Sequence, residues 1–95
     1  IMHFVYIIYS KSVDKYYIGE THDVEKRVNL HNQGNIKSAF TTISDDWKVA
    51  LKHDCKDRQE ALFLERFLKR MKSRKFIEKA ISNPSILSDI LSKKL

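Results

Sequence analysis

Three kinds of side chain that can together cut a phosphodiester occur in this sequence of 95 residues. Tyr6 and Tyr17 stand near its start, and Arg27 and Glu65 follow farther along the chain. An arginine can hold a phosphate through two parallel hydrogen bonds, and a carboxylate can hold a divalent metal ion. A phenol beside such cations can take a proton from water. These residues indicate phosphodiester hydrolysis if the fold brings them together.

Both tyrosines lie in segments that are typical of β-strands. Residues 3–9 are rich in aromatic and β-branched side chains, and residues 16–20 follow after a short turn-like stretch. The short connection favours an antiparallel hairpin. Tyrosines are common in strands, so either tyrosine can also be a packing residue without a chemical role.

A helix is expected after the second strand. Thr21 or Asp23 can cap its start, it runs to about Gln33, and Gly34 is a natural stop. This helix would carry Arg27.

One face of this helix combines apolar and chemically active side chains. Val24, Arg27, Val28 and His31 recur at helical spacing, and the valines mark their face as inward. A partly buried guanidinium needs an anionic partner, which is either a carboxylate of the protein or a phosphate of a substrate. His31 would contact a phosphate, assist proton transfer or be a hydrogen-bonded histidine at the edge of the core.

The middle of the chain supplies a loop, a strand and the longest helix. Residues 35–46 are polar and predict a loop, and residues 47–51 alternate as a third strand does. Residues 57–60 fit a capping box with Asp in place of Ser or Thr, and the helix ends near Ser73. Its apolar stripe consists of Ala61, Leu62, Phe63, Leu64, Phe67, Leu68 and Met71.

Glu65 borders this stripe. Its carboxylate is expected either to pair with Lys69 one turn on or to bind a metal ion such as Mg²⁺, which usually takes one or two carboxylates and keeps several waters.

Two more helices complete the chain. One covers about residues 74–81, and Asn83-Pro84 reads as the N-cap and first position of a last amphipathic helix. The order is therefore β-β-α-β-α-α-α, a mixed α/β (α+β) chain. We expect a single domain over residues 1–95, with 83–95 as an added C-terminal helix.

The charge of the chain favours a polyanionic partner. Lysine and arginine number 18 against 12 acidic residues, which gives a net charge of +6. Six cations fall in residues 66–75, which hold no acid, and they predict either a ridge that binds a nucleic-acid backbone or a plain solvated face: Arg66, Lys69, Arg70, Lys72, Arg74 and Lys75.

Cysteine usage and hydropathy bear on location. The one cysteine, Cys55, favours a reducing cytoplasm and reads as a small residue near a strand end rather than a nucleophile. No apolar run is long enough to cross a bilayer, and no secretory signal is expected.

Taken together, these pieces resemble the GIY-YIG nuclease superfamily. The first motif reads Phe4-Val5-Tyr6 and the second Tyr17-Ile18-Gly19, and the resemblance covers roughly residues 3–80. Arg27 matches the helix arginine, His31 the histidine or tyrosine one turn later, and Glu65 the metal-binding glutamate. The chain is most similar to small stand-alone bacterial members, which look like the amino-terminal nuclease domain of the UvrC excision-repair protein.

This resemblance implies a three-stranded antiparallel sheet flanked by helices, a single Mg²⁺ or Mn²⁺ ion, and hydrolysis of DNA. Tyr6 or Tyr17 would activate water, Arg27 would stabilise the transition state and Glu65 would hold the metal. The chain departs from the family at Phe4, in place of a glycine, and at Glu20, where the UvrC-like domain tends to carry a lysine. An acid at that position would weaken attraction of phosphate.

The sequence is therefore compatible with three functions. The leading one is a metal-dependent endonuclease acting on DNA, in repair or recombination. The first alternative keeps the fold and binds DNA or RNA without cutting it. The second is a protein-interaction domain that uses the last helix, with Ile86, Leu87, Ile90 and Leu91, in a monomer or weak dimer.

Overall fold

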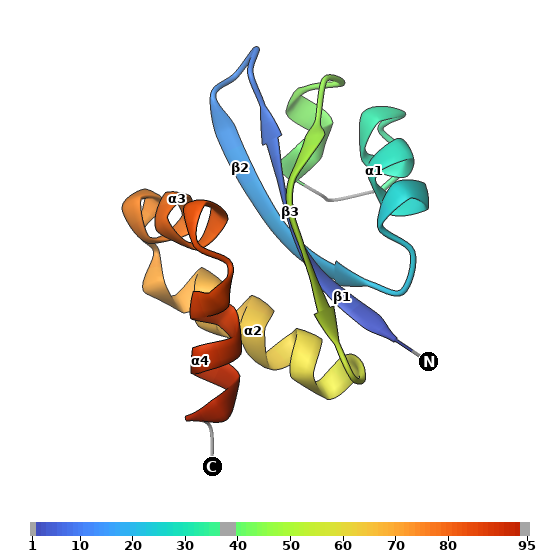
Figure 1. The fold of residues 1–95 in the computed structure, drawn as a ribbon. Helices are drawn as coiled ribbons and strands as arrows, with labels where there is room; N and C mark the ends of the chain where they lie inside the picture. Colours follow the sequence, from blue (N-terminus) through green and yellow to red (C-terminus); the bar gives the residue numbers. More distant parts are fainter. Residues whose placement is uncertain (1, 37–39, 94–95) are drawn as a thin grey trace.

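A three-stranded antiparallel sheet forms the middle of the molecule, and helices cover both of its faces (Figure 1). The computed structural model describes residues 2–36 and 40–93. The expected order and fold class are confirmed. The elements are β1 (His3–Ser10), β2 (Lys15–Thr21), α1 (Val24–Asn32), the short 3₁₀ helix η1 (Phe40–Ile43), β3 (Lys48–Cys55), α2 (Arg58–Met71), α3 (Arg74–Ser82) and α4 (Ser85–Ser92).

Strand β1 is central, and β2 and β3 pair with it on either side. Because side chains alternate across a strand, Tyr6 and Ile8 pack on the α1 face, with Val24, Val28 and Trp47. Val5 and Ile7 pack on the opposite face, against residues of α2, α3 and α4. The sheet therefore separates two apolar cores, and Figure 1 shows α1 on one side and α2, α3 and α4 on the other.

Side-chain caps define the starts of the two helices that carry candidate residues. Of the two predicted caps, Thr21 and Asp23, it is Asp23 that begins α1, by accepting from the Lys26 N–H at 3.1 Å. Asp57 begins α2 by accepting from the Glu60 N–H at 2.9 Å. The returning bond of this capping box goes one residue earlier than usual, because Glu60 accepts from the Lys56 N–H at 3.0 Å.

The segment before β3 differs from the predicted loop. Residues 37–39 lie outside the described part of the chain, but residues 40–43 form η1. Thr41 is buried there, and its carbonyl accepts from the indole N–H of Trp47 at 2.9 Å. This contact joins residues without periodic spacing, so the sequence pattern could not indicate it.

Two boundaries also differ from prediction. Strand β3 begins after Trp47 and continues to Cys55, because its backbone pairs with β1 as far as His3. The last helix begins at Ser85, and Asn83 does not cap it as predicted: its side chain accepts from the Ser85 hydroxyl at 2.6 Å rather than from a backbone N–H. Cys55 is buried at the strand end, where burial raises the pKa of its thiol to about 11.

The last helix belongs to the packed body of the protein. Leu87 of α4 is fully buried in the same core as residues of α2 and α3. Within residues 2–36 and 40–93, no helix combines the length and apolar character that crossing a membrane requires.

Gly19 is the position at which the sheet tolerates no side chain. It pairs with Tyr6 across β1 and β2, and a Cβ atom at position 19 would stand 2.5 Å from Cζ of Tyr6. The aromatic ring thus occupies the volume that any other residue would need.

We predict that Gly19→Ala destabilises the protein by roughly 1–3 kcal/mol, because the added methyl group forces the Tyr6 ring to move. Urea unfolding measures this free energy. The cost should shrink when the same change is made in a Tyr6→Val background. Equal costs in the two backgrounds would show that the Tyr6 ring is not the cause.

Candidate active site

Tyr6 is buried, and its hydroxyl group lies inside the protein. The residue is 1% exposed, and its Oη is 2.8 Å from Nε2 of His31. Burial, and then the nearby Tyr17, raise the pKa of the Tyr6 phenol well above its usual value. Tyr6 therefore keeps its proton at neutral pH.

His31 is the second buried group, and its protonation follows from its neighbours. Burial, and then the charge of Arg27, lower the pKa of the imidazole to about 4, so the ring is neutral at pH 7. Each ring nitrogen has one hydrogen-bond partner: the Tyr6 hydroxyl for Nε2, and Oγ1 of Thr41, at 2.6 Å, for Nδ1. The single proton of the neutral ring lies in one of these two bonds, and a hydroxyl donates in the other. Together the two bonds hold the imidazole in one orientation.

Thr41 is itself held by contacts that connect α1 to β3. Its carbonyl accepts from the Trp47 indole, and the backbone of Trp47 is bound twice by the side-chain amide of Asn32. These two bonds, at 3.0 and 2.7 Å, join the end of α1 to the start of β3. The chain of bonds from Tyr6 to Thr41 is thus anchored to the scaffold.

Tyr17 contacts the same histidine but is less buried than Tyr6. Its ring stands edge-on to His31, with 4.9 Å between centroids, and 6.5 Å from the ring of Tyr6. The residue is half-buried. Within residues 2–36 and 40–93 no protein group hydrogen-bonds to its hydroxyl, and every buried polar side-chain atom there has a partner. The Tyr17 hydroxyl is therefore open to solvent, unlike that of Tyr6.

Arg27 lies half-buried on the predicted inward face of α1, beside the buried Val24 and Val28. Its charge acts on both Tyr6 and His31. Across the described ranges, no carboxylate comes within ion-pairing distance of it, although such a group is normally matched by an anion. Of the two partners that the sequence allowed, residues 2–36 and 40–93 supply no carboxylate.

Glu65 reaches the site from α2, on the other side of the sheet. Its carboxylate accepts from Nζ of Lys69 at 3.2 Å, as one of the two alternatives predicted. The same Nζ lies 5.6 Å from the ring centroid of Tyr17, and the charge of Glu65 acts on Tyr6. The structure therefore brings together all five residues that the sequence singled out: Tyr6, Tyr17, Arg27, His31 and Glu65.

The donor set limits which metal ion the site could hold. In the described part of the chain, no three His, Cys, Asp or Glu side chains converge as a metal-chelating group. Zinc-type coordination, which needs three or four protein ligands, therefore does not fit these residues. A Mg²⁺ ion that keeps most of its waters fits a single carboxylate such as Glu65.

Glu20 has partners that offset its charge. Its carboxylate accepts from Nε2 of His3 at 2.5 Å and lies 3.5 Å from Nε of Arg58. No spacing in the sequence connects these three positions, which come from two strands and a helix.

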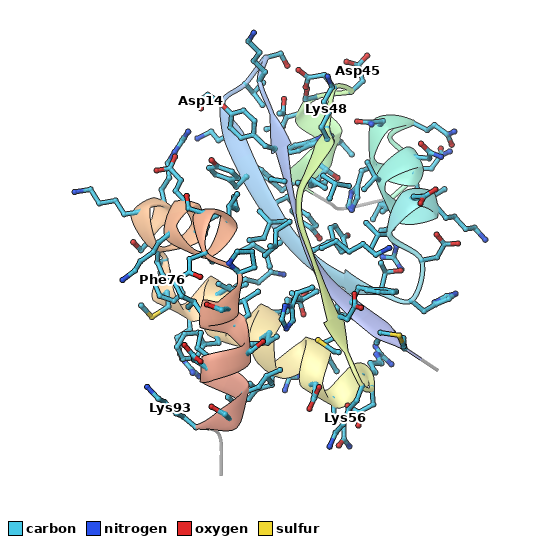
Figure 2. All side chains as sticks on the ribbon, in the orientation of Figure 1. Asp14, Asp45, Lys48, Lys56, Phe76 and Lys93 are labelled. Atoms are coloured by element: carbon cyan, nitrogen blue, oxygen red, sulfur yellow. The ribbon has the colours of Figure 1, made fainter. Side chains whose placement is uncertain are left out.

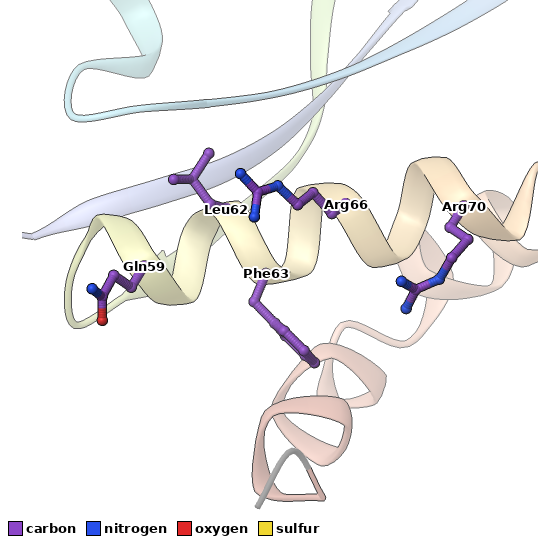
Figure 3. A pocket seen from close by; sticks show the side chains of 5 residues that line it. All are labelled: Gln59, Leu62, Phe63, Arg66 and Arg70. Carbon is purple, nitrogen blue, oxygen red and sulfur yellow. The ribbon is translucent and has the colours of Figure 1, made fainter.

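The predicted cationic ridge divides over two helices. Figure 3 shows Arg66 and Arg70 projecting from successive turns of α2, along a hollow that Phe63, pointing toward α4, also lines. Lys69 and Lys72 line a separate hollow beside β2. Lys75 of α3 is exposed.

Arg74 is occupied by structural contacts. It binds Asp14 at 2.6 Å and Glu78 at 3.3 Å, and it stacks over the ring of Tyr16. Asp14 lies in the turn between β1 and β2, at the opposite end of the molecule from Lys56 (Figure 2). Arg74 thus ties this turn to the start of α3.

Sequence reasoning missed Thr41 and Arg58. Thr41 stands in a polar stretch with no periodicity, and Arg58 reads as an ordinary residue of a helix start. Their partners, His31 for Thr41 and Glu20 for Arg58, lie in other elements of the fold, so no periodic pattern in the sequence indicates either contact.

One comparison with known proteins gave a match. The family model of the GIY-YIG catalytic domain matches residues 2–78, which include every residue of the site. The end of α3 and all of α4 lie beyond this match. Neither the curated proteins nor the solved structures yielded a match.

The buried neutral His31 predicts a pH dependence of stability. Its pKa is about 4 in the folded protein and about 6.5 when unfolded, so only the unfolded chain takes up a proton between these values. The stabilising contribution should be full above about pH 6.5 and be lost as the pH falls toward about 4.

Urea unfolding at several pH values, with His31→Gln as the reference, measures this contribution. The difference in unfolding free energy between wild type and variant should shrink as the pH falls. A difference that stays constant, or that grows, would show that folding does not lower the pKa of His31.

Proposed function

Because this chain belongs to the GIY-YIG catalytic domain family, we propose that it is a metal-dependent endonuclease that hydrolyses DNA phosphodiesters. The observation that carries the proposal is Arg27, a half-buried guanidinium without a carboxylate partner in the described structure. Its charge acts on Tyr6, and the phosphate of a substrate would supply the missing anion. A fixed cationic fork of this kind stabilises charge that develops at phosphorus in the transition state.

The two tyrosines have different roles in this proposal. The Tyr17 hydroxyl is open to solvent, so it can lose its own proton to solvent, and the resulting phenolate would take a proton from the attacking water. The Tyr6 hydroxyl is buried and already hydrogen-bonded to His31, so it cannot meet that water. Tyr6 and His31 act as positioning residues, because the edge of the imidazole packs against the Tyr17 ring.

Glu65 would hold the metal ion, either Mg²⁺ or Mn²⁺. A divalent cation there would neutralise charge on the scissile phosphate and favour loss of a proton from water. Lys69, which now binds the Glu65 carboxylate, would have to release it.

The proposed substrate is DNA, in keeping with the basic character of the chain. Lys69, Arg70, Lys72 and Lys75 remain candidate backbone contacts, whereas Arg74 would add little while it is bound to Asp14 and Glu78. A role in repair or recombination and a cytoplasmic location stay predictions, as does a single-domain organisation with an added C-terminal helix.

One observation favours the alternative of a DNA- or RNA-binding module that does not cut. Lys69 already neutralises Glu65, which is the carboxylate that a metal ion would need. Binding without cleavage, unchanged by Glu65→Gln, would support that module.

We predict that Glu65→Gln and Arg27→Gln each lower the rate of DNA nicking in Mg²⁺ by about 100-fold or more, since each removes charge stabilisation at the reacting phosphate. Relaxation of supercoiled plasmid measures the rate. Lys56→Gln, which removes a cation remote from the site, should nick like wild type. If all four proteins nick equally, the activity does not reside in this site.

We also predict that Lys69→Gln tightens Mn²⁺ binding by roughly two- to fivefold, because an exposed ion pair of this spacing is worth under about 1 kcal/mol. Isothermal titration calorimetry without DNA measures the affinity. Lys72→Gln removes the same charge near the end of the same helix and should have a smaller effect. Unchanged affinity in Lys69→Gln would mean that the metal does not bind at Glu65.

A further inference from the structure

A hollow opens beside the proposed active site, where the ends of β1 and β2 meet α1 and the start of α2. Arg27 belongs to both places, since it acts on Tyr6 and also lines this hollow. The side chains that line the hollow are mostly cationic or able to become so: His3, Glu20, Thr21, His22, Arg27 and Arg58.

The two arginines in the hollow are differently occupied. Arg27 has no carboxylate partner in the described part of the chain. Arg58 has one, because Nε lies 3.5 Å from the Glu20 carboxylate, but its side chain is 68% exposed. An exposed ion pair is weak, so an incoming anion can replace Glu20 as the partner of Arg58 at little cost.

Glu20 is itself held in place without Arg58. Nε2 of His3 donates to it at 2.5 Å, and the ring of His22 lies 6.4 Å from the ring of His3. If an anion took the Arg58 guanidinium, Glu20 would therefore keep a hydrogen-bond partner and would not become an orphaned acid.

We infer that this hollow is a second phosphate-binding subsite, for a phosphodiester group of the polynucleotide next to the one that is cut. Arg58 binds that group, while Arg27, which also lines the hollow, holds the reacting phosphate. Glu20 pairs with Arg58 in the free protein as an internal anion. This inference rests on the proposed nuclease function. It extends that function because the family motifs give no role to Arg58 or to Glu20.

The subsite also explains how the chain accommodates Glu20. An acid alone would repel phosphate, but here its charge is opposed by the cation that it positions. The attraction lost at position 20 is supplied by Arg58 from the start of α2. Glu20 then weakens nucleic-acid binding by competing with phosphate for Arg58, rather than preventing it.

Binding of a fluorescently labelled DNA duplex in EDTA, followed by anisotropy at several salt concentrations, tests this inference without cleavage. Arg58→Gln should weaken binding by roughly fivefold to tenfold and reduce the salt slope by about 1. Lys56→Gln is the matched control, since it removes an exposed cation two residues away that pairs with Glu60 and not with Glu20. It should change binding by less than about twofold.

Glu20→Gln supplies the opposite test. It should tighten binding by roughly two- to fivefold, and most of this gain should vanish when Arg58→Gln is also present. Circular dichroism checks that each variant is folded, as expected for the exposed Arg58 side chain.

The inference is overturned if Arg58→Gln binds as Lys56→Gln does, if Glu20→Gln does not tighten binding, or if the wild type does not bind DNA at low salt. Its failure is distinguishable from failure of the nuclease proposal. A wild type that binds DNA through Arg58 but never cuts it would contradict only the nuclease proposal. A wild type that cuts DNA, while Arg58→Gln binds DNA normally, would contradict only the subsite.

Discussion

The contact between the Tyr6 ring and the backbone at Gly19 is the constraint on which the site depends. Because position 19 has no side chain, the Tyr6 ring can occupy the space where a Cβ would stand, and its hydroxyl reaches Nε2 of His31. His31 then fixes Thr41, and through Trp47 the bonds continue to the scaffold. A larger residue at position 19 would displace the first member of this chain and with it the orientation of the imidazole against Tyr17.

The order of strands explains how groups from opposite faces of the sheet meet. Strand β2 is an edge strand, so residues of α2 can reach around it toward the face that carries Tyr6 and Tyr17. Glu65 and Lys69 approach in this way, as the contact of Lys69 with the Tyr17 ring shows. Arg27 comes from α1 on the other side. The site is thus built at the edge of the sheet that β2 forms.

Periodic features of the site could be predicted from the sequence, and long-range ones could not. Helical spacing was enough to place Arg27 and His31 on the inward face of α1, and the structure confirms this. The pairing of Glu65 with Lys69 was one of two predicted alternatives for the same reason. Thr41 and Arg58 escaped prediction because their partners are set by the packing of distant elements. Arg74 leaves the predicted ridge because Asp14, sixty residues earlier, binds it.

In the proposed reaction the half-buried phenol of Tyr17 exchanges the proton with water, and the buried phenol of Tyr6 positions His31. Single-turnover cleavage of duplex DNA by Tyr17→Phe and Tyr6→Phe, each under saturating Mg²⁺, tests this most directly. Tyr17→Phe should be slower than wild type by about 100-fold or more, because it loses the proton acceptor. Tyr6→Phe should lose only about tenfold, through a less well oriented imidazole. A Tyr17→Phe variant that cuts at the wild-type rate, or a Tyr6→Phe variant that is slower than Tyr17→Phe, would contradict the account.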